Sequence, residues 1–161
     1  MHRELTDSEF QRIERALALA QPLVAPVEVV IIDDSVSEIE GIQAVLERWP
    51  EVRLTTFLIQ RRVATLPVAP PTTQVVLLDH IIHPEDIRLP NGYHMAQALE
   101  QSGCKAVIGS ISRARNQPAY AKRQFRWKLE VLSDDQSARE FVQFMNALIE
   151  ISRQTPRAAG E

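Results

Sequence analysis

Residues 27–34 read VEVVIIDD, a run of six residues, five of them apolar, followed at once by two aspartates. A nearly continuous apolar run is typical of a central strand in a parallel sheet, which helices cover on both faces. Ser35 and Glu38 then have the spacing of a capping box, which starts a helix. Its expected inward positions are Val36, Ile39, Ile42, Val45, Leu46 and Trp49. Strand, acidic turn and helix predict the opening of an open α/β sheet.

The rest of the chain continues this alternation. Apolar and β-branched runs predict strands at 53–58, 75–78, 106–112 and 126–132. Helical patterns follow at 59–66 and 93–101, and a last helix begins at the acidic stretch 133–135, where negative charge suits the helix dipole. Five strands alternating with helices predict a doubly wound, five-stranded parallel sheet.

An additional helix is expected before the first strand. Thr6 and Glu9 form a capping-box pair, and Pro22 and Pro26 bracket a linker. Its apolar stripe consists of Phe10, Ile13, Leu17 and Ala20. This stripe needs a cover, either the domain's own sheet or a second copy in a homodimer, and the sequence leaves both open. The expected organisation is a helix and linker at 1–26, one domain at 27–152 and a disordered tail at 153–161.

Composition excludes several classes of protein. A chain of 161 residues with 45% hydrophobic residues can bury a core without disulfides, and Cys104 is its only cysteine. It has no signal peptide and no apolar run of membrane-spanning length, so we expect a cytoplasmic protein without membrane contact. The net charge is −3, and the basic residues between 113 and 126 match no binding motif, so nucleic acid is not an expected partner.

Acidic residues end two of the expected strands: Asp33 and Asp34 follow the first, and Asp79 follows the third. In open α/β sheets, ligands bind at the carboxyl ends of the strands. If these strands are neighbours, like charges about 4 Å apart repel by about 4 kcal/mol at an effective dielectric near 20. Hard divalent cations relieve such crowding, and carboxylate oxygens suit Mg²⁺.

A carboxylate at this position can also act as a nucleophile. Aspartate can carry a phosphoryl group as an acyl phosphate. The charge on the transferred group then needs donors, usually a hydroxyl and an amine. Ser110 and Ser112 lie near the end of the fourth expected strand, and Lys128 lies on the fifth. These residues make Asp79 a candidate phosphate acceptor.

Four segments, in this order and spacing, resemble the CheY-like receiver domains of two-component response regulators: IIDDS, VVLLD, PNGY and VIGSIS. The resemblance implies a flavodoxin/CheY-like fold, with Mg²⁺ held by Asp33, Asp34 and Asp79 and phosphorylation on Asp79. It further implies a sensor histidine kinase or phosphotransfer protein as donor and a downstream protein target. The chain would then be a stand-alone switch and not an enzyme.

Three features depart from the receiver pattern. The segment between Asp79 and Gly92 is long, the switch hydroxyl is either Ser110 or Ser112, and the Lys-Pro pair expected after strand five is missing. A pseudo-receiver that binds partners without phosphorylation is therefore the alternative. A phosphohydrolase of the haloacid dehalogenase type would need a second acid two residues after its nucleophile, where Ser35 or Ile81 stands. His80 and His83 alone are a weak metal signal.

Overall fold

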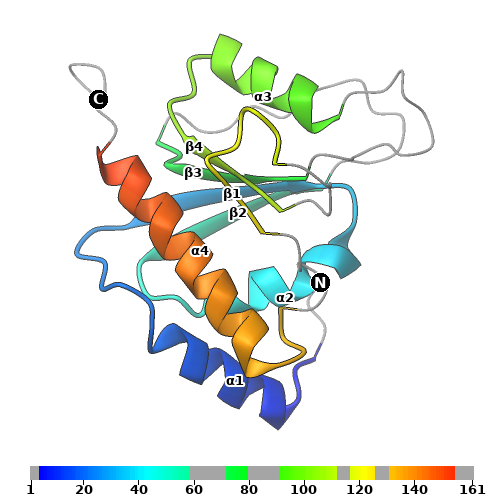
Figure 1. Cartoon of the computed structure of the whole chain (residues 1–161), viewed down its shortest axis with the longest axis vertical. Coiled ribbons are helices and arrows are strands. Elements are labelled where there is room, and N and C mark those ends of the chain that lie inside the picture. The colour runs from blue at the N-terminus through cyan, green and yellow to red at the C-terminus, as the bar shows by residue number, and fades with distance from the viewer. Residues whose placement is uncertain (1–3, 59–71, 80–90, 112–116, 126–130, 155–161) are drawn as a thin grey trace.

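A computed structural model of the chain describes residues 4–58, 72–79, 91–111, 117–125 and 131–154 (Figure 1). The expected short helix at 59–66 lies outside these ranges. The elements are α1 (Asp7–Leu17), β1 (Val27–Asp33), α2 (Val36–Glu47), β2 (Val52–Leu58), β3 (Val75–Leu78), α3 (Gly92–Gln101), β4 (Val107–Ser110), β5 (Arg123–Gln124) and α4 (Asp135–Gln154).

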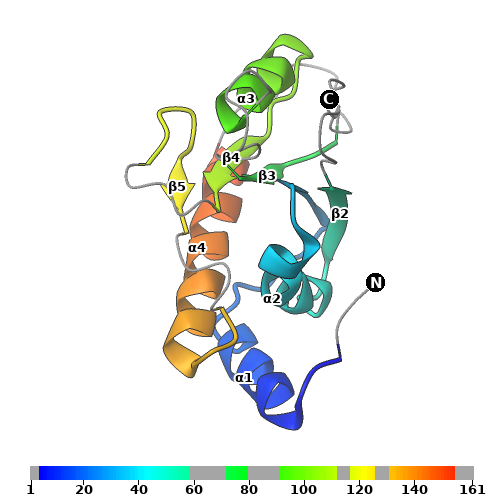
Figure 2. The ribbon, with the colours of Figure 1, turned by 90° about the vertical axis from the view of Figure 1, so that its right-hand side faces the viewer.

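The strands form one parallel sheet in the order β2-β1-β3-β4-β5. Figure 2 shows β2 and β5 at its opposite edges. This order is that of the flavodoxin and CheY group of doubly wound folds. The predicted fold class, with an extra N-terminal helix, is therefore confirmed.

Two apolar layers cover the faces of the sheet. Val29 and Ile31 of β1 pack into the larger core with residues of α1, α2 and α4. Val30 and Ile32 point the other way and pack with Met95 of α3. Figure 1 shows α3 on one side of the sheet and the other helices opposite. The continuous apolar run that predicted β1 thus reflects burial on both faces.

The N-terminal helix forms as its capping signal predicts. The Glu9 amide donates to Thr6 Oγ1, and the Thr6 amide donates to Glu9 Oε1, both at 3.1 Å. Ile13 is buried as expected, but Phe10 is 40% exposed, so the expectation of a fully inward stripe was wrong at that position. The ring of Phe10 lies under the Arg48 guanidinium, with 4.9 Å between the Arg48 Cζ atom and the ring centroid.

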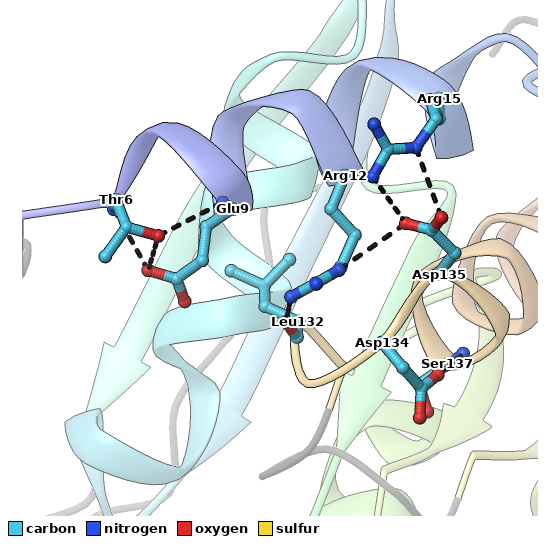
Figure 3. Close-up of polar contacts among 8 residues, drawn as sticks. All are labelled: Thr6, Glu9, Arg12, Arg15, Leu132, Asp134, Asp135 and Ser137. Atoms are coloured by element: carbon cyan, nitrogen blue, oxygen red, sulfur yellow. Dashed lines mark hydrogen bonds and ion pairs between the residues drawn. The ribbon is translucent and has the colours of Figure 1, made fainter.

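Polar contacts fasten α1 to α4 (Figure 3). Arg15 Nη2 lies 2.8 Å from Asp135 Oδ1, and Arg12 donates to the Leu132 carbonyl. Beyond the end of α1, the Gln21 amide donates to Asn146 Oδ1 at 3.0 Å, and Asn146 Nδ2 donates to the Leu19 carbonyl. The helix therefore packs on its own domain, and a homodimer through α1 stays a prediction.

The fifth strand was placed too late in the chain. It spans Arg123–Gln124. Of the expected strand, residues 126–130 lie outside the described ranges, and Val131 and Leu132 lie in a turn and are buried. The apolar residues Val131 and Leu132 suggested a strand because they are buried, but a packed turn buries apolar residues as well as a strand does. The fourth strand is also shorter than expected, ending at Ser110.

Gly109 of β4 provides a test of the packing between α4 and the sheet. An added Cβ would lie 2.4 Å from Leu148 Cδ1 and 3.0 Å from Phe144 Cζ. We expect Gly109→Ala to lower the free energy of unfolding by about 1–3 kcal/mol through overpacking, measured by urea unfolding. In a Leu148→Val background, which lacks the clashing methyl, the same substitution should cost much less. An equal cost in both backgrounds would refute this packing.

The contact between Arg15 and Asp135 provides a pH test. The hydrogen bond from Arg15 holds the pKa of Asp135 below its ordinary value. A depressed carboxyl pKa stabilises the fold above the ordinary pKa, and this stabilisation is lost as pH falls through the folded-state value. Asp135→Asn should therefore lower the melting temperature at neutral pH, and the difference should disappear in strong acid. Glu150→Gln, at the other end of α4, is the matched control and should change little at either pH.

Candidate functional site

The three predicted acids meet at one edge of the sheet. Asp33 ends β1 and Asp79 follows β3, and these neighbouring parallel strands pair Ile32 with Leu78. The Asp79 amide continues the ladder by donating to the Ile32 carbonyl at 3.0 Å. One carboxylate oxygen from each of Asp33, Asp34 and Asp79 lies within 4.8 Å of the other two. The expectation that adjacent strands bring these carboxylates together is confirmed.

The backbone orients Asp33. Its Oδ1 atom accepts hydrogen bonds from the amides of Asp34 at 2.7 Å and Ser35 at 3.1 Å. The expected capping-box bond from Ser35 is not formed: the Ser35 side chain makes no cap hydrogen bond, and its Oγ pairs with Ser37 Oγ at 3.0 Å. Instead, the Asp33 carboxylate accepts a hydrogen bond from the Ser35 amide, and this bond stabilises the turn after β1.

The cluster fits a hard divalent cation. Asp33 and Asp79 are buried, at 0% and 3% exposure, and Asp34 is half-buried. Three ionised carboxylates at this spacing repel one another, and the cost rises with burial. Their oxygen donors are those that Mg²⁺ and Ca²⁺ prefer, and a site open to solvent at Asp34 would let Mg²⁺ keep several of its waters.

Ser110 lies at the same edge of the sheet, one strand beyond β3. It ends β4, is fully buried and pairs in register with Leu78, the residue before Asp79. The Ile111 amide donates to the Leu78 carbonyl at 3.1 Å, which ties the two strand ends together. Ser112 and Lys128 lie outside the described residues, so their parts in the site remain predictions.

Tyr120 is a site neighbour that the sequence did not reveal. Burial, and next the negative charge of Asp79, raise the pKa of its phenol well above the ordinary value. The half-buried Tyr120 packs against the buried cluster on the α3 side of the sheet, which includes Met95 and Leu99 of α3. The sequence analysis noted only the basic residues of this segment, although an isolated aromatic residue among basic residues was a usable signal for burial.

No protein-family model matches the sequence, and no curated protein shows significant sequence similarity to it. The solved structures that are similar in fold include the following three. The BeF3-activated DrrB receiver domain is 13% identical, with a TM-score of 0.47 over 73% of this chain and 95% of that one. A fusion protein carrying a trimeric coiled-coil segment of yeast Spc42 is 12% identical, with a TM-score of 0.50 over 84% and 89%. The complex of the CheA3 P1 domain with CheY6 from R. sphaeroides matches at 18% identity, with a TM-score of 0.43 over 75% and 98%.

Similarity at these identities concerns the fold alone. Together with the strand order, the match at a TM-score of 0.50 agrees with the expected doubly wound α/β fold of the flavodoxin/CheY-like group, and the acidic cluster lies at the expected edge of the sheet. None of the described helices has the length and apolar content needed to span a bilayer.

Crowding of the carboxylates has a measurable consequence. In EDTA, Asp79→Asn should raise the free energy of unfolding by about 1–2 kcal/mol, because one of three mutually repelling charges is removed. Urea unfolding of the variant beside the wild type measures this. Glu100→Gln, an exposed carboxylate-to-amide change on α3, is the control and should have little effect. A loss of stability in Asp79→Asn would show that the cluster is held by donors and is not destabilised by repulsion.

Proposed function

We propose that the chain is a response-regulator receiver that accepts a phosphoryl group on Asp79 with Mg²⁺. One observation carries this proposal: three carboxylates, two of them buried, converge within 4.8 Å at the carboxyl edge of a doubly wound sheet. Ligands of such sheets bind at this edge. An isolated structural acid would not require two further carboxylates beside it.

The chemistry is a phosphoryl transfer to a carboxylate. An Asp79 oxygen attacks phosphorus and forms a new O–P bond, while the bond from phosphorus to the donor breaks and the leaving group departs with the electron pair. The product is an acyl phosphate. Mg²⁺ held by Asp33, Asp34 and Asp79 would offset the charge of the incoming group. Ser110 or Ser112 would donate to a phosphoryl oxygen, and Lys128 is the candidate amine.

The partners follow from this role. The phosphoryl donor would be a sensor histidine kinase or a phosphotransfer protein. The phosphorylated chain would signal by contact with a downstream protein, in the cytoplasm, and would not itself be an enzyme.

The second candidate is a pseudo-receiver, a phosphorylation-independent interaction module. It is favoured by the residues after β5, where Phe125 and Arg126 stand in place of the Lys-Pro pair typical of receivers. Because β5 spans Arg123–Gln124, the Lys-Pro pair is missing at the corrected end of the strand as well. A site without its amine would be phosphorylated slowly or not at all.

The deciding experiment is incubation of the purified chain with acetyl phosphate and Mg²⁺, followed by intact-mass measurement. We expect the mass of one phosphoryl group to be added to the wild type, and the adduct to be lost on treatment with hydroxylamine, as an acyl phosphate requires. Asp79→Asn should give no adduct, and EDTA should prevent it in the wild type. Asp134→Asn, an aspartate change at the start of α4, is the matched control and should be modified normally.

Two other outcomes separate the candidates. An adduct that persists in Asp79→Asn would place the acceptor elsewhere and refute the assignment. No adduct, with no rise in melting temperature on adding Mg²⁺, would identify the acids as structural and favour the pseudo-receiver.

A further inference from the structure

The outer edge of β2 is an open edge of the sheet. This strand is the first in the sheet order, pairs with β1 alone and forms one margin of the sheet in Figure 2. Its seven residues, Val52–Leu58, keep an unbroken register with β1. A strand in this position presents one row of backbone N–H and C=O groups that its own sheet does not pair.

The hydrogen bonds to β1 identify the residues of this row. The Val27 amide donates to the Glu51 carbonyl at 2.8 Å, so the odd-numbered residues of β2 turn their backbone groups toward β1. Successive residues of a strand alternate in this direction. The backbone groups of Leu54 and Thr56 therefore point outward, and no residue in the described ranges bonds to them.

The two edges of the sheet differ in their protection. Natural sheets block their edges with short strands, lysines, prolines or bulges. The strand β5 has two of these features, because it is two residues long and the adjacent Lys122 is exposed. The strand β2 is longer, contains no proline, has no bulge against β1 and carries a single charge, that of Arg53. This edge is therefore open to the addition of another strand.

The position of β2 is fixed from the inner side. Val52 and Leu54 pack against the larger core, and Phe57 packs against the smaller one. Gln43 Nε2 of α2 donates to Thr56 Oγ1 at 3.1 Å. An edge that is already ordered spares a complex the cost of ordering it on binding.

A second copy of β2 fits this edge. Two strands related by a twofold axis run antiparallel and present the same surface to each other. Thr55 is the middle residue of the seven, so an axis through Thr55 pairs the whole strand. Leu54 then lies opposite Thr56 of the second copy, and these two residues exchange both backbone hydrogen bonds.

The side chains that meet in this register are compatible. Thr55 lies opposite Thr55 of the second copy, and pairs of threonines stabilise antiparallel strands. The exposed Arg53 lies opposite Phe57, and a guanidinium over an aromatic ring is a favourable contact. An axis through Arg53 would instead place two like charges opposite each other. This self-complementarity favours a second copy over an unrelated peptide as the occupant.

We propose that β2 is a dimerisation edge: two copies of the chain pair their β2 strands antiparallel about a twofold axis at Thr55 and join their five-stranded sheets into one. The proposal goes beyond the phosphoacceptor role and is independent of it, because no part of this interface uses the cluster at Asp79.

Cross-linking of the full chain tests the register. In a Cys104→Ser background, Thr55→Cys places two thiols in a non-hydrogen-bonded pair, where the Cα atoms lie about 4.5 Å apart, within the range of a disulfide. We expect a covalent dimer on mild oxidation, detected by non-reducing electrophoresis. The matched control Arg53→Cys, on the same face of β2, should not cross-link, because its two copies would lie about 13 Å apart.

Analytical ultracentrifugation over a range of concentrations tests the association itself. We expect the wild type to dimerise reversibly. Thr55→Lys should weaken dimerisation about fivefold, or about 1 kcal/mol, because two ammonium groups then face each other across the axis. An equimolar mixture of Thr55→Lys and Thr55→Asp should restore the dimer.

Two controls accompany this measurement. Gln101→Lys adds the same charge at an exposed position on α3 and should dimerise as the wild type does. Asp79→Asn should also dimerise normally, which keeps this result separate from that of the phosphorylation assay. Melting curves will show that each variant stays folded.

Three results would overturn the proposal. A monomer at every concentration, with no disulfide in Thr55→Cys, would show that the edge does not pair. Equal cross-linking at positions 53 and 55 would reflect random collision and not a defined register. A dimer that Thr55→Lys leaves intact would place the interface elsewhere, such as on α1.

Discussion

The central strand β1 is buried on both faces, and much of the architecture follows from this constraint. Its backbone pairs with β2 on one side and β3 on the other. Its side chains alternate between two cores, Val29 and Ile31 in one and Val30 and Ile32 in the other. Helices must therefore cover both sides of the sheet. The parallel pairing with β3 also brings the carboxyl ends of two strands, and their acids, to the same edge.

The sequence predicted those parts of the fold in which a local pattern of residues is compatible with only one structure. Val75–Leu78 is a short apolar run ended by an acid, and it forms β3 with the limits expected. Thr6 and Glu9 satisfy each other's amides and start α1 where their spacing indicates. The acidic cluster was predictable for the same reason, because Asp33 and Asp79 each follow a strand that only a central position could bury.

The features that sequence missed depend on contacts between distant segments. The short strand β5 is polar at Arg123 and Gln124, and its position is set by backbone bonds to β4, such as the Phe125 amide to the Ser110 carbonyl. Val131 was predicted to lie in a strand because it is apolar. In the structure it packs against Gly41 of α2, where an added Cβ would lie 2.3 Å from Val131 Cγ1. Tyr120 likewise acquires its relation to Asp79 only through the tertiary fold.

The attachment of α1 to α4 affects the order in which the elements fold. The bond between Arg15 and Asp135 joins residues 120 positions apart, and that between Gln21 and Asn146 spans 125. During synthesis, α1 must therefore wait until α4, more than 100 residues later, has been made before this docking surface exists. An isolated helix of 11 residues is only marginally stable in water, and contacts of such long sequence separation form late because loop closure opposes them. Although α1 is made before α4, it should thus be among the last helices to acquire its native contacts, and its apolar residues stay open to chaperones or to premature association until α4 folds.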